Sequence, residues 1–346
     1  MFWRSEASPE SFPEESWHRK HRLPRIPTIY IRDSEGNLGA TAIGRTIRMR
    51  SALRIDANKI FSYNRIIILQ AKGTWNMTIR KALTVAGSDT SGGAGIQADL
   101  KTFQEFDVYG MTALTTIVCM EPKTWDHQVF PVALDIVETQ LKTVLEGIGI
   151  DAMKTGMLGS VEIIELVSQY IDRYDLKRIV IDPVMVCKGT DEVLQPENTE
   201  AMLEFLLPRA DLVTPNLFEA SQLAKSGPIT SLDQMQEAAA IIHERGAKNV
   251  LIKDRGKIRE GKAMDLLYDG KNFEWFEADT IVTKYTHGAG CTSSASITAN
   301  LAKGLTVRES VQQAKAFITQ AISNGFPLND FVGPTRHSAH RSISAN

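Results

Sequence analysis

The sequence predicts an α/β fold with a mostly parallel central sheet flanked by helices. From Ala82 onward, short apolar segments alternate with amphipathic segments of helical length, which is typical of βαβ units. Several apolar segments are followed directly by glycine or polar residues, and the carboxyl ends of parallel strands form the ligand-binding edge of such a sheet. The 346 residues, 43% of them hydrophobic, suffice for a large core in one or two domains.

Each expected strand is a short apolar run, and each expected helix carries apolar residues at helical spacing. The strands are Leu83–Ala86, Thr112–Val118, Ala152–Thr155, Arg178–Ile181, Leu212–Thr214, Val250–Lys253, Met264–Tyr268 and Phe273–Phe276. The helices are 93–106, 134–147, 161–173, 197–206, 216–225, 231–246, 290–303 and 307–324. Gly87, Lys154, Asp182 and Asn216 each stand at or just beyond a strand end, so we expect them to converge on one edge.

The first 76 residues differ in character from the rest. They hold 13 Lys/Arg and 7 Asp/Glu, a net charge of +6, whereas the remaining 26 basic and 34 acidic residues give −8. No sustained helical or strand period runs through this segment, and Ile66-Ile67-Ile68-Leu69 is its strongest apolar run. We therefore expect residues 1–76 to be a disordered or non-native extension and residues 77–346 to be the folded domain.

Four interpretations of the extension stay open: a disordered arm, an organelle transit peptide, a nucleic-acid-binding tail, and translated sequence upstream of the natural start. Its 7 acidic residues count against a transit peptide. Met77 directly precedes the first expected core strand and fits a natural initiator.

Charge, cysteine content and hydropathy bound the function classes. A net charge of −2 argues against nucleic acid as the main partner. Cys119, Cys187 and Cys291 are far apart without the spacing of metal ligands, which indicates reduced thiols in the cytoplasm. The sequence shows neither an apolar run long enough to cross a membrane nor the pattern of a signal peptide, so we expect no membrane partner.

The segment Thr286–Ala295 places two glycines and a cysteine where a loop becomes a helix. Glycine lets backbone N–H groups approach an anion closely, and the first turn of a helix has unpaired N–H donors. The same field favours a thiolate, so the pKa of Cys291 is expected to be lowered. By itself, the pattern is also typical of a tight helix start without a ligand.

Other motifs strengthen the phosphate interpretation. They are, in chain order, Gly87–Gly95, Asp151–Leu158, Ile181–Gly189 and Thr214–Ala220, followed by Gly288-Ala289-Gly290-Cys291. In order and spacing, the set resembles the ribokinase-like vitamin kinases, in the branch that phosphorylates pyridoxal, pyridoxine and hydroxymethylpyrimidine, and most of all the pyridoxine kinases of Gram-positive bacteria. The resemblance covers about Met77 to Arg341. It implies a ribokinase-like three-layer fold and a homodimer that uses ATP and Mg²⁺.

The resemblance also implies a vitamin pocket. Its substrate-binding residues correspond here to Gly87, Ala94, Asp99, Met120, His127, Met157 and Val184. A glycine-rich turn such as Gly87–Gly95 is equally typical of close strand–helix packing. Hydroxymethylpyrimidine-specific members carry glutamine where this chain has Met120, and a thioether cannot pair with an aminopyrimidine. Met120, with His127 beside the ring, therefore favours B6 vitamers as substrates.

Nucleotide, metal and catalytic residues follow from the same resemblance. ATP contacts correspond to Glu192, Lys253, Gly288 and Ser293, and the magnesium site to Asp182, Asn216 and Glu219. Asn and Glu three residues apart at a helix start are also an ordinary capping pair, so both interpretations stay open. The catalytic residues implied are Cys291, Cys187, Gly288, Ala289 and Gly290.

The implied catalytic residues have distinct roles. The N–H groups of Gly288, Ala289 and Gly290 would hold the transferring phosphoryl group. Cys291 stands where many ribokinase-like enzymes have an aspartate base. Cys187 belongs to a loop that would close over the phosphates, although it also fits a small buried apolar side chain.

One departure from the family pattern concerns the nucleotide. After Val250–Lys253, the resembled family usually continues with two glycines, and this chain has Asp254-Arg255. A negative charge there would repel ATP phosphates, and Asp is less permissive than Gly, so we expect either the nucleotide affinity or the path of this loop to depart from the family pattern.

The expected function is ATP-dependent phosphorylation of the hydroxymethyl group of pyridoxine, pyridoxal or pyridoxamine. Two alternatives stay open. One is a hydroxymethylpyrimidine kinase of thiamine synthesis, and the other is a non-catalytic vitamin-sensing protein whose basic arm binds a partner.

Overall fold

The computed structural model describes residues 78–185 and 196–343, and four short strands at 29–32, 38–42, 61–63 and 66–68. The chain divides into two compact units, Met1–Met77 and Thr78–Asn346. In the first unit, β1 (Ile29–Arg32) pairs antiparallel with β2 (Leu38–Ala42), and β3 (Phe61–Tyr63) pairs antiparallel with β4 (Ile66–Ile68). The sequence predicted no strand there, because runs this short show no recognisable alternation of apolar residues.

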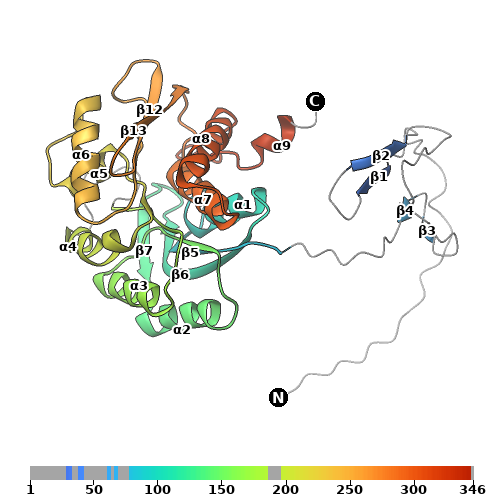
Figure 1. The fold of residues 1–346 in the computed structure, drawn as a ribbon, viewed down its shortest axis with the longest axis horizontal. Helices are drawn as coiled ribbons and strands as arrows, with labels where there is room; N and C mark the ends of the chain where they lie inside the picture. Colours follow the sequence, from blue (N-terminus) through green and yellow to red (C-terminus); the bar gives the residue numbers. More distant parts are fainter. Residues whose placement is uncertain are drawn as a thin grey trace. The chain divides into compact units, whose positions relative to one another are not determined.

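The second unit is built around a nine-stranded, mostly parallel sheet (Figure 1). Its strands are, in spatial order, β13 (Phe273–Asp279), β12 (Lys262–Tyr268), β11 (Val250–Ile252), β10 (Leu212–Val213), β9 (Ile179–Ile181), β8 (Ala152–Thr155), β5 (Lys81–Asp89), β6 (Tyr109–Met120) and β7 (His127–Pro131). The strands from β11 to β6 run parallel, whereas β12, β13 and β7 are antiparallel to their neighbours. The predicted strands are confirmed. The exposed edge strand β7 was not predicted, because it lacks apolar alternation.

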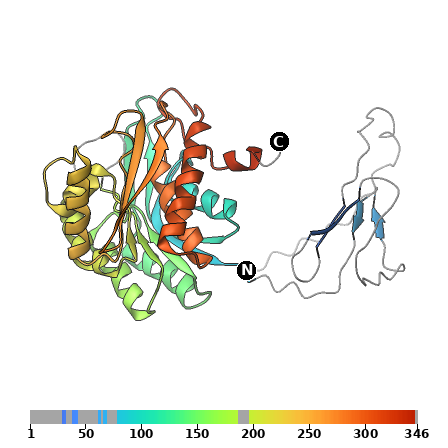
Figure 2. The same ribbon diagram turned by 45° about the horizontal axis from the view of Figure 1, so that its top comes forward.

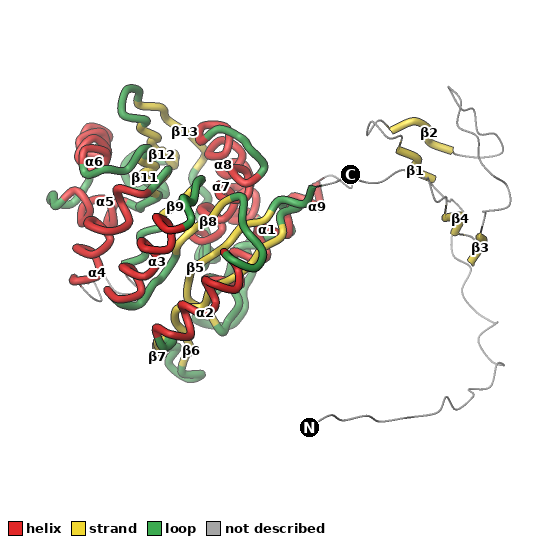
Figure 3. Tube along the Cα trace, turned by 60° about the horizontal axis from the view of Figure 1, so that its bottom comes forward, coloured by secondary structure: helices red, strands yellow, loops and turns green. Residues whose placement is uncertain are grey.

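Helices cover both faces of this sheet (Figure 2 and Figure 3). One face carries α1 (Gly95–Glu105), α7 (Ala289–Ala302) and α8 (Val307–Ser323). The other carries α2 (Leu134–Leu145), α3 (Val161–Arg173), α5 (Leu217–Ala224) and α6 (Leu232–Glu244). Among the described residues, every helix is too short or too polar to span a lipid bilayer.

Two helical segments depart from the sequence prediction. The segment predicted as one helix over 197–206 begins as α4 (Pro196–Ala201), widens to a π-helix at Met202–Leu206, and tightens to a 3₁₀ turn at Leu207–Arg209. Pro208 lies in that last turn and has no N–H to continue an α-helical ladder. The short helix α9 (Ala339–Ile343) was not predicted.

The sheet separates two apolar cores, because alternate side chains of a strand point to opposite faces. In β9, Ile179 and Ile181 belong to the core beneath α2, α3, α5 and α6, whereas Val180 belongs to the core beneath α1, α7 and α8. Burial on both faces explains why the central strands are almost continuously apolar. Both layers of helices therefore hold the carboxyl ends of the strands in fixed positions.

Candidate active site

A pocket of about 370 Å³ lies at the edge where the parallel strands end, which is within the usual size range of small-molecule sites. The first turn of α7 and the residues at or just after the carboxyl ends of β5, β6, β8, β9, β10 and β11 form most of its wall. The predicted site residues that line it are Gly87, Ala94, Met120, His127, Met157, Asp182, Val184, Asn216, Glu219, Lys253, Gly288, Ala289, Gly290 and Cys291.

Four predicted residues, Asp99 among them, are not placed in this wall. Cys187 and Glu192 fall outside the described residues, so their roles stay predictions. Ser293 lies in α7 without lining the pocket, and its neighbour Ser294 instead donates a hydrogen bond to Oδ2 of Asp182 at 2.9 Å.

Asp99 lies beneath the pocket wall, where the prediction had placed it against the vitamin. The side chain is fully buried in α1, and its Oδ2 accepts hydrogen bonds from Thr84 Oγ1 at 2.7 Å and Lys154 Nζ at 3.0 Å. Lys154 does line the pocket. Asp99 therefore neutralises and orients Lys154, and its expected contact with the vitamin stays a prediction.

The loop before α7 is shaped by a glycine that cannot be replaced without strain. Gly288 has a φ of +76°, in the left-handed region. A β-carbon on it would lie 1.8 Å from the carbonyl oxygen of Gly93, so the loop before α7 is pressed against the loop that follows β5. The two glycine-containing motifs thus form one surface.

The start of α7 has the properties of an anion site. Its first turn carries no acidic residue, and no side chain caps it. The N–H of Ala289 donates to the carbonyl of Thr286 at 3.1 Å, so this predicted phosphate donor already has a partner. Within the described residues, Gly290 and Cys291 are the first-turn residues whose N–H groups have no acceptor. Of the three predicted donors, Gly288 and Gly290 thus keep a free N–H group, and Cys291 adds another.

A hydrogen bond between side chains fastens the two loops together. Nε2 of His287 donates to Oδ2 of Asp89 at 2.7 Å, and the Ser91 hydroxyl donates to the same oxygen at 2.9 Å. Burial opposes ionisation of Asp89, but the hydrogen bonds from His287 and Ser91 outweigh it and lower its pKa to about 2. Asp89 is therefore a permanently charged acceptor that holds the loop before α7 in place.

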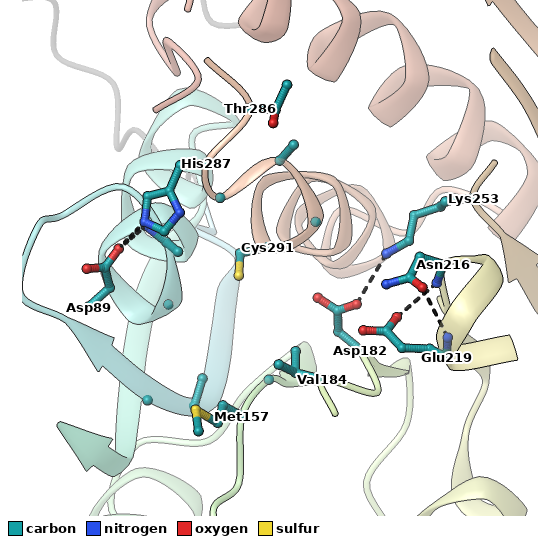
Figure 4. Close-up of a pocket in the computed structure, with 18 of the residues that line it drawn as sticks. Asp89, Met157, Asp182, Val184, Asn216, Glu219, Lys253, Thr286, His287 and Cys291 are labelled. Atoms are coloured by element: carbon teal, nitrogen blue, oxygen red, sulfur yellow. Dashed lines mark hydrogen bonds and ion pairs between the residues drawn. The ribbon is translucent and has the colours of Figure 1, made fainter. Parts of the chain in front are cut away.

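Cys291 lies between two polar groups of the pocket. Figure 4 shows the Asp89–His287 pair on one side of it and the Lys253–Asp182 pair on the other. Burial, reinforced by the charge of Asp99, raises the pKa of the Cys291 thiol to about 12. The sequence predicted a lowered value from the helix field alone. That prediction is wrong in direction, because burial disfavours the thiolate.

The nucleotide side of the pocket centres on a buried lysine–carboxylate pair. Lys253 follows β11, and its Nζ lies 3.2 Å from Oδ1 of Asp182, which follows β9. Thr214 and Ser294 donate further hydrogen bonds to the same carboxylate. Although burial disfavours its charge, Lys253 and Lys154 hold the pKa of Asp182 below its usual value. Asp182 is therefore ionised and already well satisfied.

Asn216 and Glu219 form the capping pair that the sequence left open. The Glu219 N–H donates to Asn216 Oδ1 at 3.0 Å, and the Asn216 N–H donates to Glu219 Oε2 at 2.9 Å. Burial, with nearby Asp182, raises the pKa of Glu219 to about 7. A cation would relieve this unfavourable negative charge, so these oxygens fit a hard divalent ion such as Mg²⁺ in addition to capping α5.

Asp254 lines the pocket, but backbone N–H groups offset the charge that was expected to repel phosphate. It is almost completely buried, and its carboxylate accepts hydrogen bonds from the N–H groups of Lys257, Ile258 and Met264 at 2.8–3.2 Å. The Asp254 side chain therefore stabilises the loop between β11 and β12 through these hydrogen bonds.

The other end of the pocket is more apolar. Met120, at the end of β6, is paired in register with His127, at the start of β7, and both line the wall. Met157 and Val184 come from the loops after β8 and β9. A flat heteroaromatic ring fits between such side chains better than a highly polar group.

The sequence of residues 89–336 matches the model of the phosphomethylpyrimidine kinase family. The chain belongs to this family. Among curated members, the pyridoxine kinase of Bacillus subtilis is 59% identical over 266 residues, which are 77% of this chain and 98% of the relative. The hydroxymethylpyrimidine/phosphomethylpyrimidine kinase of the same organism is 41% identical over 270 residues, covering 78% of this chain and 99% of the relative.

Solved structures show the same fold. The ADP complex of Bacillus subtilis pyridoxal kinase superposes with a TM-score of 0.74 at 58% identity, covering 76% of this chain and 99% of that one. Staphylococcus aureus pyridoxal kinase in complex with AMP-PCP and pyridoxal gives 0.73 at 50% identity, covering 77% and 96%. The ribokinase-like fold class predicted from the sequence is thereby confirmed.

Sequence reasoning gave no chemical role to several charged or titratable residues that line the pocket, among them Asp89, Lys154, Arg255 and His287. The strand-end position of Lys154 had placed it on this edge, and Asp89 carries the same signal at the end of β5. The Asp89–His287 contact joins residues 198 positions apart, so no local sequence pattern predicts it.

Proposed function

We propose that the protein is an ATP-dependent kinase that phosphorylates the hydroxymethyl group of B6 vitamers, pyridoxal and pyridoxine foremost. The observation that carries this proposal is the pairing, in one pocket, of an uncapped helix start with an apolar ring-sized wall. Relatives named pyridoxine kinases, which are 51–59% identical over about three quarters of the chain, support it.

On the phosphate side, the free N–H groups of Gly290 and Cys291 would hold the oxygens of the transferring group. Lys253 would add a positive charge beside them. The vitamin hydroxyl oxygen forms the new bond to phosphorus as the bond to the β–γ bridging oxygen breaks, and that oxygen leaves with the electron pair on ADP. The hydroxyl proton passes to an oxygen of the transferring phosphoryl group and from there to solvent.

Asn216, Glu219 and Asp182 are the residues that would hold Mg²⁺. Bound there, the ion would neutralise polyphosphate charge. Asp182 contributes its charge at a distance, because its oxygens are already occupied by Lys253, Thr214 and Ser294.

Cys291 is proposed to contact the hydroxymethyl group as a neutral thiol. A general base must be unprotonated at the working pH, and a thiol with a pKa of about 12 is not. Because charge on the attacking oxygen develops late in a loose transition state, the proton can leave without a strong base in the resting site.

The test compares kcat/KM for pyridoxal, pyridoxine and hydroxymethylpyrimidine with ATP and Mg²⁺, using purified full-length protein. We expect both B6 vitamers to be turned over with higher kcat/KM than hydroxymethylpyrimidine. A preference for hydroxymethylpyrimidine would overturn the assignment in favour of the thiamine route. That second activity is supported by the 41% identical relative and opposed by Met120 in the wall.

The proposal includes a homodimer in the cytoplasm. Val129 and Phe130 of β7, with Leu134 and Ile136 at the start of α2, leave 40–53% of their surface exposed. Exposed apolar side chains beside an unpaired strand edge favour association of two copies. Light scattering at micromolar concentration measures the mass, and a strictly monomeric mass would refute this part.

A further inference from the structure

The side chain of Arg255 places a positive charge at the anion site, and the proposed mechanism has not used it. Arg255 stands in the loop after β11, is exposed, and lines the pocket. A β-carbon placed on Gly290 would lie 3.5 Å from Nη2 of Arg255. Since Gly290 provides one of the two free N–H groups of α7, the guanidinium lies directly beside the start of that helix.

The backbone aims Arg255 at this position. Its φ is +61°, a left-handed conformation that a non-glycine residue rarely adopts. The preceding residue fixes the loop, because the carboxylate of Asp254 binds three backbone N–H groups and its own N–H donates to Oδ1 of Asp265 at 3.2 Å. The carboxylate of Asp254 is thus occupied by hydrogen bonds within the loop, and Arg255 is turned toward α7.

The guanidinium is uncommitted within the described part of the chain. Arg255 has no ion pair or hydrogen bond with a described side chain, whereas Lys253 is paired with Asp182. It is close enough to Glu219 for its charge to oppose the effect of burial on that residue's pKa. Arg255 therefore faces the space between the start of α7 and the start of α5.

We propose that Arg255 binds the terminal phosphate of the nucleotide, and the same phosphoryl group once it is on the vitamin. This inference deepens the proposed function and rests on it. A guanidinium offers several N–H donors in a fixed plane that matches two phosphate oxygens, and it stays protonated, so it takes no proton in the reaction. It joins the N–H groups of Gly290 and Cys291 on the transferring group.

The test replaces Arg255 in two ways. Arg255→Gly removes the guanidinium and accepts the positive φ without strain, and Arg255→Gln keeps a polar side chain without charge. Arg259→Gln is the matched control, because Arg259 is an exposed arginine of the same loop that does not line the pocket. Thermal melting establishes that each variant is folded.

Calorimetry then measures Kd for AMP-PCP, ADP and pyridoxal 5′-phosphate. For both Arg255 variants we expect about a tenfold weaker Kd for AMP-PCP and pyridoxal 5′-phosphate and less than a twofold change for ADP, with all three unchanged in Arg259→Gln. The loss for AMP-PCP should shrink in 0.5 M salt, where the Debye length is roughly 4 Å, because the charge of an exposed group is then screened. The kcat/KM for ATP should fall about 10- to 100-fold.

Two results would overturn the inference. One is wild-type affinity for AMP-PCP in both variants, and the other is an equal loss for AMP-PCP and ADP, which would make Arg255 a general nucleotide contact. Because these are equilibrium measurements, they are independent of turnover. A wild-type protein that binds AMP-PCP but phosphorylates no B6 vitamer would refute the proposed function and leave the Arg255 result standing.

Discussion

The ionisation of Cys291 gives the sharpest quantitative prediction. A rise of its pKa from 9.0 to about 12 lowers the fraction of thiolate about 10³-fold at any pH below 9, since each pKa unit is a factor of ten. Alkylation proceeds through the thiolate. We therefore expect iodoacetamide to modify Cys291 about 10³ times more slowly at pH 7.5 than an ordinary thiol that is equally accessible.

The assay is peptide mapping by mass spectrometry after timed alkylation between pH 6.5 and 10.5. The rate at Cys291 should rise about tenfold per pH unit over this whole range, without a plateau. Cys119, the other described free thiol, is partly exposed and reports reagent activity in the same samples. Lys154→Met should slow the reaction further, because Lys154 is a nearby positive charge that favours the thiolate.

A plateau in the Cys291 rate below pH 8 would refute this reasoning. It would show that the helix field overcomes desolvation, as the sequence alone had suggested, and it would restore the thiolate as a resting base. In that case kcat for pyridoxine should follow the same titration. With a neutral thiol, kcat carries no such inflection, and Cys291→Ser retains most of the rate.

Three further predictions concern separate parts of the molecule. Glu219→Gln keeps the cap of α5. Because the carboxyl pKa is raised in the folded state, the wild type loses stability as pH rises from 4.5 to about 7, so the variant should be more stable by about 3 kcal/mol at pH 8 and equally stable at pH 4.5. Mg²⁺ should raise the Tm of the wild type alone. Equal melting curves at pH 8 would contradict this. Met120→Gln should shift relative kcat/KM toward hydroxymethylpyrimidine about three- to tenfold, since it adds a hydrogen-bonding amide, and an unchanged ratio would remove Met120 from the substrate site. Deletion of residues 1–76 should leave Tm and kcat nearly unchanged, because a relative aligns over 98% of its own length to 77% of this chain; a large loss of either would show that the extension contributes to the folded enzyme.

Sequence patterns predicted the fold well because most of its elements carry their own signal. The strand Ala152–Thr155 and the helix Val161–Arg173 were predicted to the residue, since the first is wholly buried and the second begins at Ser160, whose side chain caps it. The elements that were missed lack such signals. β7 is exposed, and the segment after Pro196 changes its helical geometry within one helix length.

The candidate site was predicted less completely, for two physical reasons. Strand ends converge by topology, so Lys154, Asp182 and Asn216 could be placed on one edge from the sequence. The balance between desolvation and a helix field depends on packing around Cys291, which no local pattern shows. The orientation of the Asp254 side chain was unpredictable for the same reason, because its N–H partners lie in its own folded loop.

The carboxylates of the site are not equivalent, and this decides how it responds to ligands. Asp89 and Asp182 have lowered pKa values and several donors each, so they stay charged whether or not a ligand is present. Asp254 is bound by backbone N–H groups. Among these four carboxylates, only Glu219 is partly protonated near pH 7, because its pKa is about 7. A cation at the site therefore changes the charge of Glu219 and leaves the Asp89–His287 contact, which positions the anion-binding loop, undisturbed.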